Sequence, residues 1–348
     1  MSFANILRKL ESNLDLNKDD LSIIIRNFEK KSLTEEEIKN LVTAWRNKGE
    51  SSSELLELAN QINNKQNQIE LDKEAVDVCG TGGDKTNTFN ISTLSAIVAS
   101  SCGVKVIKHS GRSTTSVSGS VDILSQFGYE IDVSNNIKEN CFKQTGLLFV
   151  SSKTLREIFG SVKPICTKLN IPGFINLLGP LTNPYITHYH LLGVSNLSWG
   201  DLIASILKNQ NKEALVVCCE IDKNIYMDEF SFCGENYIWK ISNDEIKKEI
   251  LNSKDFQKEI VNIKELSIKN ISESKSIFED ILKGKLYNEK TKENEPKSDV
   301  VALNSGAILY LTKKVKSIQD GYNLSLKHIQ SGKAWEHFQE FITSIKMR

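Results

Sequence analysis

The sequence has no excess of charge of either sign, because 44 basic side chains stand against 44 acidic ones in a chain of 348 residues. This balance argues against a protein whose main work is to coat nucleic acid or an anionic membrane. It leaves room for a local basic pocket that binds a phosphorylated substrate. We therefore expect an ordinary globular protein whose function depends on small clusters of residues.

Long apolar runs are lacking too, since none approaches the roughly 20 residues that a membrane helix needs. The first residues soon become charged, without the apolar core or cleavage site of a signal peptide. We therefore expect a cytoplasmic protein with no membrane partner. The seven cysteines are an odd number without CxxC spacing, which indicates reduced thiols rather than a disulfide framework or a zinc site.

The amino-terminal part has the pattern of a helical domain. Leucines recur at helical spacing, and residues 32–37 (Ser-Leu-Thr-Glu-Glu-Glu) and 51–54 (Ser-Ser-Ser-Glu) are typical of capped helix starts. These features predict a small domain of three or four helices over residues 1–66.

The sequence pattern changes at Ala75, where short apolar strands begin to alternate with helical patterns. This alternation predicts an α/β fold over residues 67–348, with helices packed on a mostly parallel sheet. Residues 242–298 are rich in Lys, Glu, Asn and Ser, and we expect solvated helix and loop there. A buried helix at 299–312 and one amphipathic helix at 322–342 are expected to close the chain. The strands are expected at 75–80, 104–110, 146–152 and 215–220.

A glycine turn, Gly80-Thr81-Gly82-Gly83-Asp84, follows the first of these strands. Three glycines in four positions let the backbone approach an anion closely and adopt positive φ. Asn90-Ile91-Ser92-Thr93 then introduces a helix, whose free N–H groups form a second anion site. Two such elements within fifteen residues predict phosphate binding. The spacing fits neither GxxxxGK[ST] nor GxGxxG, which disfavours a P-loop nucleotidase or a Rossmann dehydrogenase.

A second polar segment runs from Lys108 to Ser120 and follows another predicted strand. It lies at the strand's carboxyl end, where open α/β sheets bind ligands. Lys108 and Arg112 offer charge for phosphates, and the hydroxyl groups offer donors for a ribose. His109 lies between these two cations, which disfavours its protonated form.

Two further motifs leave alternatives open at this point. Asp228-Glu229, expected in a loop after the strand at 215–220, is either a solvated acidic pair or a ligand pair for Mg²⁺. The run from Asn176 to Pro184 (NLLGPLTNP) breaks a helix, and Gly179 within it marks either a close approach to a flat ligand or a plain chain reversal.

Taken in order, GTGGD, NxST, KH with its Ser-rich loop, NLLGPLTNP, Asp-Glu and NSGAILYL resemble the anthranilate phosphoribosyltransferase family over almost the whole chain. The resemblance implies a homodimer, with the small domain completed by a segment near 165–190. It implies transfer of the phosphoribosyl group from phosphoribosyl diphosphate to the amine of anthranilate, a small aromatic amine, in tryptophan synthesis. An aniline nitrogen needs no prior deprotonation, so we assign no general base.

The resemblance also implies the binding residues. Those for phosphoribosyl diphosphate would be Gly80, Gly83, Asp84, Thr88, Asn90, Ile91, Ser92, Thr93, Lys108, His109, Ser110, Gly111, Arg112, Ser113, Thr114, Thr115, Ser116 and Ser120. Ser92, Asp228 and Glu229 would hold Mg²⁺, as two ions. The anthranilate positions would be Gly80, His109, Gly111, Cys166 and Gly179.

The sequence departs from the family pattern on the acceptor side. Gly111 stands where the family has an Asn that bonds anthranilate, and Cys166 where it has an Arg that pairs with the anthranilate carboxylate. Losing one charge-assisted contact costs about 1.5–3 kcal/mol. Arg156, Lys163 and Lys168 lie in the same segment and are candidates to replace the Arg. A His-Pro pair of the family is also missing from 152–160.

These departures keep two other hypotheses open. One is a related phosphoribosyltransferase or nucleoside phosphorylase with a different acceptor, because Ser110-Gly111-Arg112 faintly resembles the phosphate loop of the phosphorylases. The other is a non-catalytic relative that binds nucleic acid, against which the neutral charge and the full set of phosphate and metal residues argue.

Overall fold

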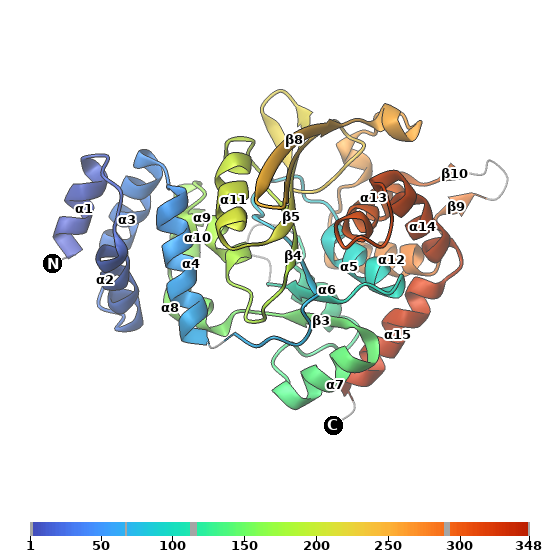
Figure 1. Cartoon of the computed structure of the whole chain (residues 1–348), viewed down its shortest axis with the longest axis horizontal. Coiled ribbons are helices and arrows are strands. Elements are labelled where there is room, and N and C mark those ends of the chain that lie inside the picture. The colour runs from blue at the N-terminus through green and yellow to red at the C-terminus, as the bar shows by residue number, and fades with distance from the viewer. Residues whose placement is uncertain (1–2, 67, 112–116, 289–292, 347–348) are drawn as a thin grey trace.

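The computed structural model describes residues 3–66, 68–111, 117–288 and 293–346. A group of helices occupies one end of the molecule, and a twisted sheet covered by helices on both faces makes up the rest (Figure 1). This arrangement confirms the predicted α/β class. None of the helices in the described ranges combines the length and apolarity needed to cross a membrane.

The amino-terminal helices form where their capping residues and apolar spacing predict them. They are α1 (Phe3–Glu11), α2 (Lys18–Glu29), α3 (Glu35–Lys48) and α4 (Ser52–Gln66). At the start of α3, Thr34 and Glu37 cap each other, because Thr34 Oγ1 accepts from the Glu37 N–H at 3.2 Å and Glu37 Oε2 accepts from the Thr34 N–H at 2.8 Å. The four helices pack around Trp45, which is fully buried.

The main sheet runs in the order β3-β2-β1-β4-β5-β7-β8, with β6 paired to β5. The neighbours from β3 to β5 are parallel, and β6, β7 and β8 add antiparallel pairs. The carboxyl ends of the parallel strands therefore lie at one edge of the sheet. The strands are β1 (Val76–Gly80), β2 (Val106–His109), β3 (Leu147–Val150), β4 (Tyr189–Gly193), β5 (Glu213–Asp222), β6 (Ile225–Met227), β7 (Glu235–Ser242) and β8 (Glu245–Leu251).

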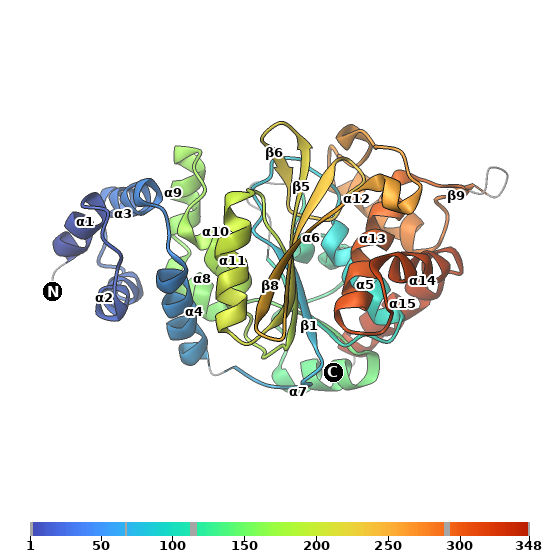
Figure 2. The ribbon, with the colours of Figure 1, turned by 45° about the horizontal axis from the view of Figure 1, so that its top comes forward.

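Two helical layers cover this sheet (Figures 1 and 2). One face carries α5 (Ile91–Ser101), α12 (Ile271–Leu282), α13 (Pro296–Leu311), α14 (Ile318–Gln330) and α15 (Lys333–Lys346). The other face carries α8 (Lys153–Phe159), α9 (Val162–Leu169), α10 (Phe174–Leu178) and α11 (Ser198–Asn209), which join α1–α4 in one hydrophobic cluster. The remaining elements are α6 (Ser120–Ser125), α7 (Asn135–Thr145) and a small hairpin of β9 (Tyr287–Asn288) and β10 (Glu293–Asn294).

Part of the predicted secondary structure was wrong. Residues 245–251, expected as helix or loop, form the exposed edge strand β8, which pairs with β7 from Ser242–Glu245 to Asn236–Leu251. The turn between the two strands explains the error, because Asn243 and Asp244 both have positive φ, as a two-residue hairpin turn of type I′ requires. The single closing helix is in fact two helices, α14 and α15, separated where Gly332 takes φ +75°.

Candidate active site

The glycine turn leaves β1 at the carboxyl edge of the sheet. The Thr81 N–H donates to the Gly193 carbonyl at 2.9 Å, and the Gly82 N–H donates to Asp228 Oδ2 at 2.7 Å. Gly82 and Gly83 have φ of +64° and +84°, which side chains rarely tolerate. The turn is therefore tied to an acidic residue 146 positions away in the chain.

Asp228 and Glu229 follow β6, rather than β5 as expected from the sequence. Burial raises the pKa of both carboxyl groups. The negative charge of Asp84 raises the pKa of Asp228 further, and the negative charge of Asp228 raises the pKa of Glu229 further. A backbone hydrogen bond from Ser92 brings the start of α5 to Glu229. A divalent cation between these oxygen atoms would relieve their repulsion, so the residues fit Mg²⁺ chemically.

A cavity of about 280 Å³ joins the glycine turn, the start of α5 and the acidic pair. Most residues predicted for phosphoribosyl diphosphate line it: Gly80, Gly83, Asp84, Thr88, Asn90, Ile91, Ser92, Thr93, Lys108, His109, Gly111 and Ser120. Ser110 instead lines a neighbouring cavity, and its N–H donates to the Val150 carbonyl at 2.6 Å. Arg112, Ser113, Thr114, Thr115 and Ser116 lie outside the described residues. We call this space the donor cavity.

Lys108 and His109, at the end of β2, are each held by hydrogen bonds. The buried Lys108 Nζ donates to the Val78 carbonyl at 2.6 Å. Burial lowers the pKa of His109, and Lys108 lowers it further against the opposing effect of Asp77. The ring accepts the Ser152 N–H at Nε2 (3.2 Å), while the His109 N–H donates to Asp77 Oδ1 at 2.8 Å. His109 is thus a neutral, fixed side chain, as its position in the sequence predicted.

A second cavity, of about 480 Å³, opens beside the first between the glycine turn and α8–α10. Its walls are largely apolar and include Leu155, Phe159, Pro164, Ile175 and Pro180. Cys79, Gly80, Thr81, His109, Gly111 and Lys163 line both spaces. We call it the acceptor cavity, because a flat aromatic ring fits such walls.

Four of the five anthranilate positions, Gly80, His109, Gly111 and Gly179, line the acceptor cavity. Cys166 does not belong with them, since its thiol is buried in the helical cluster. A Cβ on Gly173 would lie 2.5 Å from its sulfur. Burial raises the pKa of Cys166 to about 11. The position at which the family pattern has an Arg is therefore occupied by a packing residue.

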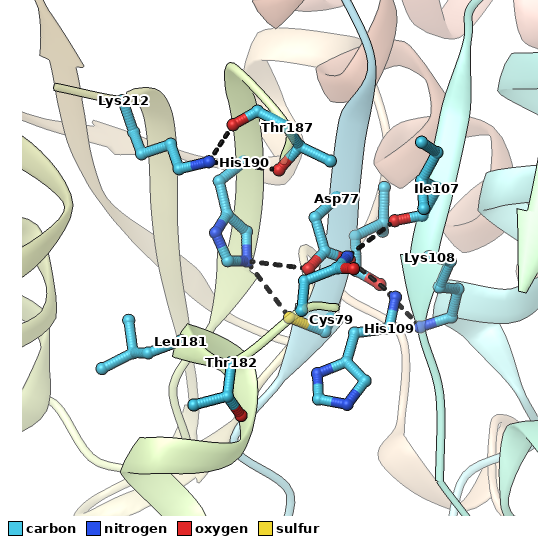
Figure 3. A network of polar contacts seen from close by, with 12 residues as sticks. Asp77, Cys79, Ile107, Lys108, His109, Leu181, Thr182, Thr187, His190 and Lys212 are labelled. Atoms are coloured by element: carbon cyan, nitrogen blue, oxygen red, sulfur yellow. Dashed lines mark hydrogen bonds and ion pairs between the residues drawn. The ribbon is translucent and has the colours of Figure 1, made fainter. Parts of the chain in front are cut away.

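The structure places two residues in the site for which the sequence motifs had predicted no individual role. Asn176, on α10, donates from Nδ2 to the Thr81 carbonyl at 3.3 Å and so connects the acceptor wall to the glycine turn. Asp77 lies beneath the turn and holds the backbone of His109 (Figure 3). The NLLGP motif was a usable signal for Asn176. Asp77 is the only charged residue of the predicted strand 75–80, and that was a usable signal for a polar side chain with a buried partner.

Comparisons with known proteins agree on one family. Residues 72–335 match the model of the glycosyl transferase family, a/b domain. The chain is 31% identical over 342 residues to anthranilate phosphoribosyltransferase of Petrotoga mobilis, covering 98% of this chain and 96% of that protein. It is 34% identical over 310 residues to the enzyme of Acetivibrio thermocellus, covering 89% and 87%.

Solved structures give the same result. The Saccharomyces cerevisiae enzyme in complex with PRPP and Mg matches with a TM-score of 0.87 and 25% identity, over 99% of this chain and 98% of that one. The Thermus thermophilus enzyme supports the fold, with a TM-score of 0.85 and 24% identity over 98% and 99%. The chain therefore belongs to the anthranilate phosphoribosyltransferase family.

Proposed function

We propose that this chain transfers the phosphoribosyl group of phosphoribosyl diphosphate to the amine of anthranilate in tryptophan biosynthesis, with Mg²⁺, and releases diphosphate. The observation that carries the proposal is the hydrogen bond from the Gly82 N–H to Asp228 Oδ2, which unites an anion-binding turn with a cation-binding pair in one cavity. The apolar acceptor cavity opens directly onto that cavity. The family relationship supports the same reaction.

On the donor side, the glycine turn and the start of α5 bind the diphosphate through backbone N–H groups. Ser92, Asp228 and Glu229 hold Mg²⁺, and the acidic cluster completed by Asp84 supports two ions. Bound Mg²⁺ neutralises the charge that grows on the leaving diphosphate. Lys108 lines the same cavity, and the bond from its Nζ to the Val78 carbonyl holds its side chain beside the glycine turn. Two hydrogen bonds fix the side chain of Asn90 in the cavity wall: Asn90 Nδ2 donates to the Ser118 carbonyl, and Ser274 Oγ donates to Asn90 Oδ1.

On the acceptor side, we assign the anthranilate carboxylate to Lys163. Of the three candidate cations, Arg156 pairs with Asp132 at 3.7 Å and Lys168 with Glu35 at 2.7 Å. Lys163 lines both cavities, and burial lowers its pKa with no opposing charge among the described residues. A carboxylate bound beside Lys163 would favour the charged ammonium form and so raise its pKa again. Proximity and alignment of the amine with the ribose supply the rest of the catalysis.

The proposed domain division is 1–66 and 67–348, with the segment near 165–190 completing the small domain. Packing of α9 and α10 against α3 and α4 supports it. The proposed homodimer forms through the small domain, whose outer helices α1–α3 lie at the end of the molecule away from the sheet (Figure 1). A partner docked there leaves both cavities open. We place the enzyme in the cytoplasm.

The deciding experiment measures turnover and donor binding separately. The protein is incubated with Mg²⁺, phosphoribosyl diphosphate and anthranilate, and loss of anthranilate fluorescence is followed. Calorimetry in parallel measures the Mg²⁺-dependent affinity for phosphoribosyl diphosphate. We expect both signals. Donor binding without anthranilate turnover would contradict the proposed acceptor and favour a related transferase for another amine, as the missing Asn and Arg allow; loss of both would contradict the proposal as a whole.

A further inference from the structure

A buried cluster lies beneath the glycine turn, on the face of the sheet towards α4 and α8–α11. Side chains alternate between the two faces of a strand, so Asp77 and Cys79 on β1 point to the same side. His190 on β4 is the direct neighbour of Asp77 in the strand register. All three residues are buried. Their ligand atoms lie within 4.8 Å of one another.

These three side chains offer three of the four ligand atoms that a tetrahedral cation site needs. Cys79 Sγ lies 3.1 Å from His190 Nε2, and His190 Nε2 lies 3.9 Å from Asp77 Oδ2 (Figure 3). In a tetrahedral zinc site, ligand distances of about 2.0–2.3 Å place neighbouring ligand atoms about 3.3–3.6 Å apart. The two measured separations lie on either side of that range. Binding the ion would therefore require the side chains to rotate until the three ligand atoms, which now lie within 4.8 Å of one another, are spaced as in a zinc site.

One oxygen atom in the cluster has no hydrogen-bond partner. Asp77 Oδ1 accepts the His109 N–H, but Asp77 Oδ2 is buried without a hydrogen bond. A hydrogen bond between the Cys79 thiol and the imidazole satisfies those two groups and leaves this oxygen alone, because Nε2 cannot accept from the thiol and donate to the carboxylate together. An unpaired buried carboxylate oxygen is costly. A cation bonded to all three atoms removes that cost.

We propose that Asp77, Cys79 and His190 form a Zn²⁺-binding site. Thiolate, imidazole and carboxylate are the ligands that zinc prefers, whereas Mg²⁺ prefers oxygen alone. Binding transfers the Cys79 proton to solvent, and the thiolate and the Asp77 carboxylate together balance the two charges of the ion. The nearest cations, Lys108 and Lys212, donate to the carbonyl groups of Val78 and Thr187 and so point their charge at other partners.

The site has an entry path that is separate from the substrate. Asp77 and His190 line a third cavity, of about 550 Å³, which also contacts α4 and the segment after α10. Cys79 borders the donor and acceptor cavities on the other side. The third cavity admits the ion and a water as its fourth ligand. No local sequence pattern marks this site, because Cys79 and His190 are 111 positions apart.

The test is a metal titration that does not depend on turnover. Full-length protein is stripped with a chelator, saturated with Mg²⁺ to fill the oxygen site, and titrated with Co²⁺ and then Zn²⁺. We expect one Co²⁺ per chain, with the near-ultraviolet band of a cobalt–thiolate bond and its loss when Zn²⁺ displaces the cobalt. A wild-type protein without that band overturns the proposal, whatever the outcome of the anthranilate assay.

Variants locate the site. Cys79→Ser should lose the thiolate band, and both it and His190→Gln should bind Zn²⁺ more than about 100-fold more weakly, since even outer partners of a zinc ligand contribute 10–100-fold. Cys102→Ser, which removes a more accessible thiol, should titrate like wild type. A band that persists in Cys79→Ser, or disappears in Cys102→Ser, contradicts the assignment. If Cys79→Ser fails to fold by circular dichroism, His190→Gln decides, because unchanged Zn²⁺ affinity in that folded variant overturns the proposal.

Discussion

The donor and acceptor cavities share a wall but are built in different ways. The donor cavity is made of backbone N–H groups, hydroxyl groups and carboxylates at the ends of β1, β2 and β6. The acceptor cavity has a mostly apolar surface from side chains of α8, α9 and α10, and the charged side chains Arg156 and Lys163 lie on those same helices. Recognition of a diphosphate depends on the path of the backbone, so the residues that set this path tolerate few substitutions. Recognition of an aromatic acid depends on packing and one charge, which several side chains can supply.

This difference explains where the chain departs from its family pattern. The glycine turn, Ser92, Lys108 and the Asp228-Glu229 pair are all in place around the donor cavity. On the acceptor side, Cys166 is part of the helical core, whereas Lys163, three residues earlier on α9, lines the cavity. The proposed role of Lys163 is therefore that of a cation supplied from a different position on the same helix.

The largest effect is expected from removing the acidic pair. Asp228→Asn combined with Glu229→Gln should lower kcat/KM by more than about 1,000-fold, because metal stabilisation of the leaving group contributes several kcal/mol. The Mg²⁺ dependence of donor binding in calorimetry should disappear. The control variant, Glu245→Gln with Glu249→Gln on the exposed strand β8, makes the same change of charge. Its kcat/KM and the Mg²⁺ dependence of its donor binding should be those of wild type. Donor binding that still responds to Mg²⁺ in the first variant would place the ion elsewhere.

The next largest effect concerns the close approach in the donor wall. A Cβ on Gly80 would lie 2.3 Å from Asp228 Oδ2, so Gly80→Ala must push the carboxylate away from the Gly82 N–H. We expect donor affinity to fall about 10–100-fold, as for loss of a charge-assisted hydrogen bond. Calorimetry measures the affinity, and thermal unfolding checks that the fold is retained. A folded variant with wild-type affinity would show that this contact does not shape the cavity.

The residues of the donor cavity could be proposed from the sequence because their signals are local. A glycine turn after a strand and a hydroxyl-rich helix start can be recognised within fifteen residues, and the structure brings them to one cavity. The edge strand β8 was missed because its lysines and glutamates suit a solvated helix, and only the Asn243-Asp244 turn reveals the hairpin. The displacement of Cys166 and the contact from Asn176 to Thr81 depend on how α8–α10 pack, which no local pattern encodes.

On the acceptor side, Lys163→Met should raise the KM for anthranilate about 10–100-fold, since a charge-assisted contact contributes roughly 1.5–3 kcal/mol. The KM for phosphoribosyl diphosphate should change much less. Lys168→Met removes a cation that already pairs with Glu35 and serves as the matched control. Because burial lowers the pKa of Lys163, its ammonium form is lost at a lower pH than that of a free lysine. The advantage of wild type over Lys163→Met should therefore shrink as pH rises. Equal KM values in the two proteins at neutral pH would contradict the assignment.

The smallest effect tests how the two cavities are joined. Asn176→Ala removes two bonds, one from Asn176 Nδ2 to the Thr81 carbonyl and one from the Gly173 N–H to Asn176 Oδ1 at the start of α10, each a net loss of about 0.5–1.5 kcal/mol. Asn209→Ala removes a comparable bond to the Ser205 carbonyl within the exposed face of α11, remote from either cavity. Urea unfolding should show a small loss of stability in both variants, and the larger loss in Asn176→Ala, which gives up two bonds instead of one. Only Asn176→Ala should also raise both KM values, by a few-fold, because its bond fixes the glycine turn against the acceptor wall. If the KM for anthranilate alone rises, the two cavities act independently, and the shared wall is a boundary rather than a coupling.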